Sequence, residues 1–177
     1  MSGYSYKNDG EKMEFKKACE IDIDEICRLV KNAIDVMEEN GIHQWDEIYP
    51  ARDDFISDMK SGNLFVGIIN KEIAVVYVLN KNQDDAYFSA SWEYTGENFC
   101  IIHRLCVNPK FQNQGVAKNT LRHIEDELVK NGVEEIRLDV FSKNPFALRL
   151  YENAGYKKTG TADWRMGRFF LMEKVLY

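Results

Sequence analysis

The chain has 177 residues, of which 45% are hydrophobic and 29% are charged, so it can form one globular domain with a sizeable core. Its formal net charge of −6 argues against nucleic acid as the main partner, because binding to phosphates needs clustered Lys and Arg. No stretch reaches the ~18 apolar residues of a membrane span, and the N-terminal residues lack the apolar segment of a secretory signal. These features predict a cytoplasmic protein without a membrane partner.

Cysteine spacing gives no sign of a metal site or a disulfide framework. None of the four cysteines forms a Cys-x-x-Cys pair, and three of them lie in segments with apolar periodicity. We therefore expect buried, reduced thiols and no bound metal. The residues concerned are Cys19, Cys27, Cys100 and Cys106.

The N-terminal third is predicted to contain one strand and two helices. Residues 1–13 are polar and are expected to be loose, and a strand is predicted over Glu14–Cys19. Apolar residues at helical spacing then predict a helix that Asp22 or Asp24 caps and that ends at Gly41. After a loop rich in aromatic and acidic residues, a second helix begins near Pro50 and stops at Gly62.

The middle of the chain reads as three strands and a long loop. Leu64–Ile69 and Ile73–Leu79 are apolar runs separated by a tight polar turn, which is typical of a hairpin. Residues 80–98 are polar and aromatic and are predicted to form a long loop of the kind that often carries function. Phe99–Val107 is the next predicted strand.

A helix that starts directly after a polar loop follows this strand. The apolar run stops at Asn108-Pro109, and helical spacing resumes at Ala117 and continues to about Asn131. The N–H groups of a first helical turn have no partner within the helix, so they form a ready site for an anion. Gly115, at the end of the loop, lets the backbone approach such an anion closely.

The C-terminal part completes a mixed α/β domain. Strands are predicted over Ile136–Phe141, Tyr156–Thr161 and Arg168–Val175, with a short helix that ends at Ala154-Gly155 after the first of them. The order is β-α-α-β-β-β-α-β-α-β-β. The sequence shows no repeat and no linker, so a single domain over residues 1–177 is predicted.

The pattern Gln112-x-x-Gly115-x-Ala117, placed after an apolar strand, resembles the acyl-CoA pyrophosphate loop of the GCN5-related N-acetyltransferase (GNAT) family. That family's form is Gln/Arg-x-x-Gly-x-Gly/Ala. A plain strand–turn–helix with a glycine in the turn is the alternative for this pattern alone.

A second pattern matches the other half of the family's cofactor site. The family form is Asn-x-x-Ala-x-x-x-Tyr-x-x-x-Gly-Phe/Tyr, and Asn144, Ala147, Tyr151, Gly155 and Tyr156 occur at the corresponding spacing. One predicted helix and one predicted strand separate the two patterns, as the family requires. The resemblance is strong over residues 99–161 and rests on element order elsewhere.

The resemblance implies a twisted mixed β-sheet flanked by helices, with acetyl-CoA as cosubstrate and no metal. It implies that strands Phe99–Val107 and Ile136–Phe141 are parallel and splay apart near Val107, where backbone groups meet the pantetheine arm. Asn144 would bind this arm, although a helix N-cap is the alternative. The implied cofactor-binding residues are Leu105, Cys106, Val107, Gln112, Asn113, Gln114, Gly115, Val116, Ala117, Lys118, Asn144, Ala147 and Tyr151.

The resemblance also implies direct attack of an amine on the thioester. Tyr151 is the candidate acid for the departing thiolate, unless it is simply a core aromatic. Glu93 and His103 are candidate bases for the amine, and a chain of waters is an equal alternative. A backbone N–H in the segment 105–107 could hold the oxyanion.

Aromatic residues next to carboxylates suggest where the acceptor binds. The candidates for a cationic amine are Trp45, Glu47, Tyr49 and Trp92, with loop packing as the alternative. The predicted function is N-acetyl transfer to a small-molecule or peptide amine by a monomer or homodimer. A non-catalytic acyl-CoA sensor is the second hypothesis, and a nucleotide-binding oxidoreductase is disfavoured because no Gly-x-Gly-x-x-Gly follows an N-terminal strand.

Overall fold

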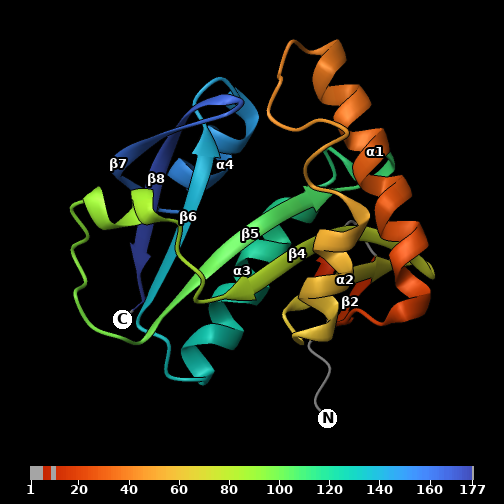
Figure 1. The fold of residues 1–177 in the computed structure, drawn as a ribbon. Helices are drawn as coiled ribbons and strands as arrows, with labels where there is room; N and C mark the ends of the chain where they lie inside the picture. The colour runs from red at the N-terminus through yellow and green to blue at the C-terminus, as the bar shows by residue number, and fades with distance from the viewer. Residues whose placement is uncertain (1–5, 9–10, 177) are drawn as a thin grey trace. The chain divides into compact units, whose positions relative to one another are not determined.

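The structure is a computed structural model that describes residues 6–8 and 11–176. The chain forms two compact units, which we describe in turn (Figure 1). Unit 1 comprises residues 1–79 and 104–120, and unit 2 comprises residues 80–103 and 121–177. Strand β5 (Phe99–Val107) and helix α3 (Val116–Lys130) each contribute residues to both units. The single-domain assignment stays a prediction.

Unit 1 contains four strands in the antiparallel order β1-β2-β3-β4. The expectation that residues 1–13 are loose is wrong for the described part of that segment, because β1 pairs with the start of β2 through Tyr6 and Met13. Backbone pairing and the burial of Met13 hold this hairpin despite its polar composition. The strands are β1 (Tyr6–Asn8), β2 (Glu11–Lys17), β3 (Leu64–Ile69) and β4 (Glu72–Asn80).

Helices α1 (Ile23–Glu39) and α2 (Arg52–Lys60) complete unit 1, together with the short 3₁₀ helix η1 (Glu20–Asp22). The apolar stripe that predicted α1 is buried in a core with side chains of β3 and β4. Both helices end near the glycines expected from the sequence, Gly41 and Gly62, which adopt φ values of 71°.

Unit 2 contains strands in the order β5-β6-β8-β7. The predicted parallel pairing is confirmed, with a register that runs from Phe99–Glu135 to Ile102–Leu138. Strands β6 and β8, and β8 and β7, are antiparallel. The remaining elements are β6 (Glu135–Phe141), α4 (Pro145–Asn153), β7 (Lys157–Trp164) and β8 (Gly167–Val175).

Residues 80–98, predicted as a long loop, form a packed cover over the sheet of unit 2. The loop contains the 3₁₀ helix η2 (Asp85–Ser89), whose Tyr87 is buried with Ile101 of β5 and Leu171 of β8. A Cβ added to Gly160 of β7 would lie 3.1 Å from a backbone atom of the loop, so a larger residue there would require the loop to shift by a few tenths of an ångström. Tyr87 therefore belongs to the core of this unit and attaches the loop to the sheet.

Burial of the cysteines follows the expectation for two of the four. Cys100 and Cys106 are buried and Cys27 is half-buried, whereas Cys19 is exposed at the cap of η1. Among the residues that the structure describes, no helix is long and apolar enough to cross a membrane.

Candidate active-site residues

The loop after β5 is attached firmly to β4 within unit 1. The amide of Asn108 donates from Nδ2 to the carbonyl of Ile73 (3.0 Å), and its backbone N–H donates to the carbonyl of Ala74 (2.8 Å). Its Oδ1 accepts from the N–H of Lys110 (3.1 Å) and so starts the 3₁₀ helix η3 (Pro109–Phe111). The loop therefore leaves the strand in a fixed direction.

The backbone of the loop turns twice through the left-handed region just before α3. Asn113 has φ 60° and Gly115 has φ 76°, and α3 begins at Val116. Val116 is 1% exposed and packs on side chains of β3 and β4, whereas residues 112–115 are exposed. Alternating backbone conformations at the start of a helix direct N–H groups outward and form an anion-binding concavity.

Seven of the predicted cofactor-binding residues lie in this loop and in the first turn of α3. Thr120, one turn further on, donates to the carbonyl of Val116 (2.8 Å), and the N–H of Asn119 donates to the carbonyl of Gly115 (3.0 Å). The first turn is thus ordered, with its N-terminal N–H groups at the exposed loop. The seven are Gln112, Asn113, Gln114, Gly115, Val116, Ala117 and Lys118.

The end of β5 supplies the residues predicted to meet the pantetheine arm. Leu105 and Val107 are half-buried, and Cys106 between them is buried in the core of unit 1. Burial raises the pKa of the Cys106 thiol to about 12. A thiol with this pKa is not a nucleophile at neutral pH, so Cys106 cannot accept the acyl group readily.

In unit 2, Asn144 caps a helix, which was the alternative to cofactor binding in the sequence analysis. It is the N-cap of α4, and its Oδ1 accepts from the N–H of Ala147 (3.1 Å). Ala147 and Tyr151 follow on one face of the helix at a spacing of four residues. The predicted contact of Asn144 and Ala147 with the cofactor stays a prediction.

Tyr151 is a buried phenol beside a carboxylate. Its side chain is 7% exposed, and its ring packs edge-on against Tyr156 with centroids 5.6 Å apart. Burial, and then the negative charge of Asp139 on β6, raise the pKa of Tyr151 above its usual value. Tyr151 therefore stays protonated at neutral pH, as a proton donor must.

Asp139 was not singled out in the sequence, yet it is the charged group that acts on Tyr151. Its carboxylate accepts a hydrogen bond from the hydroxyl of Tyr87 (2.8 Å). The signal that could have found it is the alternation of strand β6, where Glu135, Arg137 and Asp139 share one face. Charged residues that alternate along a predicted strand indicate that another polar segment of the chain packs on that face.

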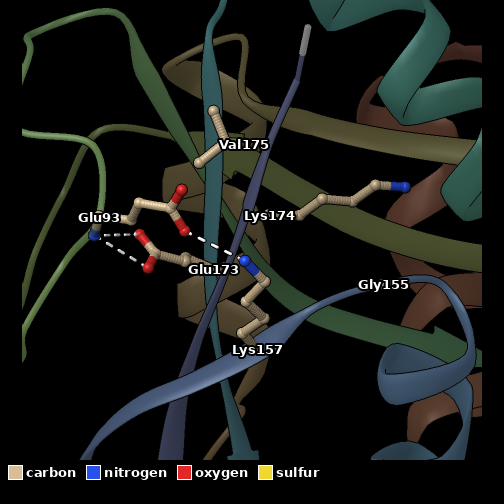
Figure 2. Close-up of a pocket in the computed structure, with 6 residues that line it drawn as sticks. All are labelled: Glu93, Gly155, Lys157, Glu173, Lys174 and Val175. Atoms are coloured by element: carbon tan, nitrogen blue, oxygen red, sulfur yellow. Dashed lines mark hydrogen bonds and ion pairs between the residues drawn. The ribbon is translucent and has the colours of Figure 1, made fainter.

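The predicted base Glu93 lies at a small open pocket of about 190 Å³ in unit 2 (Figure 2). Its carboxylate is exposed and pairs with Lys157 (3.2 Å), and its backbone N–H donates to the carboxylate of Glu173 (2.9 Å). Figure 2 shows these groups pointing toward one another, whereas the ammonium of Lys174 points away. Gly155 and Val175 complete the lining.

The other predicted base, His103, lies on β5 one residue beyond its last paired position with β6. Its Nε2 lies 3.0 Å from Oδ1 of Asn80, and the ring is half-buried. Because Oδ1 of Asn80 only accepts, this contact is a hydrogen bond in the forms of the ring that carry a proton on Nε2.

Comparison with known proteins gives the family. Residues 33–156 match the family model described as "Acetyltransferase (GNAT) family". This chain belongs to that family. Of the curated relatives, the [Ribosomal protein bS18]-alanine N-acetyltransferase of Escherichia coli (strain K12) is 37% identical over 57 residues, which are 32% of this chain and 38% of the relative. The chain thus matches well under half the length of that relative.

Solved structures of GNAT proteins share the fold. A GNAT-family acetyltransferase from Streptococcus agalactiae matches with a TM-score of 0.85 and 23% identity, over 98% of each chain. The PaiA N-acetyltransferase from Thermoplasma acidophilum, solved in complex with coenzyme A, matches with a TM-score of 0.69 and 16% identity, over 92% of this chain and 98% of that one. At these identities the likeness shows the fold of a mixed α/β GNAT domain.

Three of the four acceptor residues predicted for this GNAT chain pack against other side chains of their own unit. Trp45 is 9% exposed and packs in the core of unit 1. The ring of Tyr49 is covered by the guanidinium of Arg104 at 5.2 Å, and that of Trp92, in unit 2, by Arg137 at 4.5 Å. Glu47 is exposed on the loop between α1 and α2. An acceptor pocket built from these groups stays a prediction.

Proposed function

We propose that this chain transfers an acetyl group from acetyl-CoA to a primary amine, by direct attack of the amine on the thioester. The observation that carries the proposal is the buried, protonated phenol of Tyr151 in a chain that also presents a left-handed, exposed loop at the start of α3. The coenzyme A complex of the T. acidophilum relative supports the choice of cosubstrate.

The cofactor is held mainly by the backbone in this proposal. The N–H groups from Gln112 to Lys118 bind the pyrophosphate at the positive end of α3. The backbone of Leu105–Val107 binds the pantetheine arm as an added strand would, and one of its N–H groups holds the oxyanion of the tetrahedral intermediate. The burial of Cys106 and the raised pKa of its thiol favour passage of the acyl group directly to the amine, without an intermediate on Cys106.

The amine must lose a proton before or during its attack. Glu93 and His103 remain candidates for the group that takes it, and the geometry adds Asp139. We favour Asp139 because it is the carboxylate whose charge acts on Tyr151, and the acid and the base of one reaction must lie near the same reacting centre.

Tyr151 acts on the departing sulfur. As the C–S bond breaks and the amide C–N bond forms, the electron pair of the broken bond goes to sulfur, and the phenol donates its hydrogen bond and then its proton to the thiolate. The proton that the amine loses balances the proton delivered to coenzyme A. A phenol with a raised pKa stays protonated until the thiolate develops.

The acceptor is proposed to be a small-molecule or peptide amine. The E. coli relative is named for acetylating an alanine of ribosomal protein bS18, so a peptide with an N-terminal alanine belongs among the substrates to be tested. The net charge of −6 is compatible with an acceptor that arrives as a cation.

Thiol release from acetyl-CoA over a panel of polyamines, amino acids, aminoglycosides and peptides tests the proposal. We expect turnover with at least one amine, and Tyr151→Phe should lower kcat by about a hundredfold while the Kd for coenzyme A stays unchanged. Tyr156→Phe, which removes a hydroxyl from the neighbouring buried ring, is the matched control and should keep its activity. Binding of acetyl-CoA without turnover on any amine would refute the transferase, and full activity of Tyr151→Phe would remove its role as acid.

A further inference from the structure

The loop 80–98 is attached by hydrogen bonds to charged residues of β6 and of the adjacent strand β8. Arg137, which is 6% exposed, donates to Oε1 of Gln83 (2.9 Å) and to the carbonyl of Tyr94 (3.2 Å). On the adjacent strand β8, the carboxylate of Glu173 accepts from the N–H of Glu93 (2.9 Å). These half-buried contacts hold the loop in one position relative to the strands.

Tyr87 makes the last of these contacts, and it is the one that reaches Asp139. Its side chain is 1% exposed, and its ring lies 5.6 Å from that of Trp92. The indole Nε1–H of Trp92 donates to the carbonyl of Tyr87 (2.8 Å), and the guanidinium of Arg137 stacks on the same indole at 4.5 Å. The hydroxyl of Tyr87 is therefore aimed at Asp139 by a ring that has no room to move.

We propose that Tyr87 is a positioning residue for the acetyl transfer: its hydroxyl orients the carboxylate of Asp139 so that it can take the proton of the amine. This inference rests on the proposed function and on Asp139 as the base. The loop 80–98 then contributes to catalysis without having to contact the substrate, because it carries the hydroxyl that orients the base Asp139.

The hydroxyl acts on the protonation of Asp139 in a definite direction. A hydrogen bond donated to a carboxylate favours its charged form, so removing the donor raises the pKa of Asp139. Other titratable or charged groups on this face and on the elements next to it include Arg137 and Glu135 on β6, Glu173 on β8, Tyr151 on α4 and His103 on β5. All of them are kept when Tyr87 is changed to Phe, so a difference between the two proteins reports the hydroxyl.

The test compares Tyr87→Phe with the wild-type chain by two readouts. The first is the pH profile of kcat, whose acidic limb should move to higher pH by about half a unit to one unit in the variant. The second needs no turnover: the carbon-13 signal of the Asp139 carboxyl, assigned with Asp139→Asn, should titrate at a higher pH in Tyr87→Phe. Replacement of Tyr87 by difluorotyrosine, which keeps the ring and strengthens the donor, should move both readouts to lower pH.

Tyr94→Phe is the matched control, because it removes a hydroxyl from the same loop at a site where the partner is Glu134. Tyr94→Phe should change neither the position of the acidic limb in the pH profile of kcat nor the pH at which Asp139 titrates. An unmoved limb in both Tyr87 variants, or an unchanged Asp139 titration, would overturn the inference. Absence of turnover in the wild-type chain would instead overturn the proposed function, and the carboxyl titration would still decide whether Tyr87 sets Asp139.

Discussion

Glu135 makes the stability of the chain depend on pH in a direction opposite to that of most carboxylates. Its side chain is fully buried and accepts from Nε of Arg137 (2.9 Å). Burial raises its pKa to about 7, with the neighbouring carboxyl of Glu173 adding to the rise and Arg137 opposing it. Glu135 and Glu173 are thus two interacting buried carboxyls, of which Glu135 is hydrogen-bonded to the guanidinium of Arg137, and below about pH 7 one proton is retained on the pair.

The sign of the effect follows from where the proton is bound. Between the unfolded value of 4.5 and the folded value of about 7, the folded chain holds a proton that the unfolded chain has released. Stability is therefore full at low pH and falls as the pH rises through about 7. At 1.36 kcal/mol for each unit of pKa, the rise amounts to about 3 kcal/mol at most.

Urea unfolding followed by tryptophan fluorescence, from about pH 5 to about pH 8, measures this contribution. Glu135→Gln cannot titrate and still offers an amide hydrogen to Glu173, so the wild-type chain should lose about 2 to 3 kcal/mol more than the variant over this range. Glu134→Gln is the control: this neighbouring carboxylate is exposed, and its hydrogen bond from Tyr94 lowers its pKa. Parallel curves for the wild-type chain and Glu135→Gln would refute the argument.

Two further predictions concern the proposed reaction. Gly115→Ala should weaken coenzyme A binding at least tenfold in calorimetry, because a Cβ costs about 1 to 2 kcal/mol at a φ of 76° and intrudes on the anion loop. An unchanged affinity would show that this loop does not bind the pyrophosphate. The second prediction compares three variants, Glu93→Gln, His103→Gln and Asp139→Asn. We expect Asp139→Asn to lower kcat about a hundredfold and to abolish the acidic limb of the pH profile. A larger loss of kcat in either of the other two variants would identify that residue as the base instead.

Much of the fold could be predicted because its signals are local. The strand Phe99–Val107 lies between polar segments and was predicted with its observed bounds. The helices α1 and α3 repeat apolar residues at helical spacing and end at glycines. The hairpin of β1 and β2 escaped prediction because edge strands with polar side chains have no apolar alternation to mark them.

The candidate site was predictable only where a pattern fixed the spacing. The loop 112–118 and the helix that carries Tyr151 each follow from their own short pattern. Asp139 and Tyr87 are 52 residues apart in sequence, so their contact depends on how the loop 80–98 returns to β6. The aromatic rings of Tyr49 and Trp92 suggested cation binding, and the structure gives each of them an arginine from its own unit.

The effect of the Asp139 charge on Tyr151 also suggests how the two proton transfers of the proposed reaction can be kept in order. While Asp139 is ionised, its charge helps to raise the pKa of Tyr151, so the phenol does not release its proton early. In the proposed reaction, Asp139 becomes neutral when it takes the proton of the amine, and loss of its charge would make Tyr151 a stronger acid as the thiolate departs. Deprotonation of the nucleophile would then promote protonation of the leaving group through a single electrostatic interaction, and burial alone would leave the two steps independent.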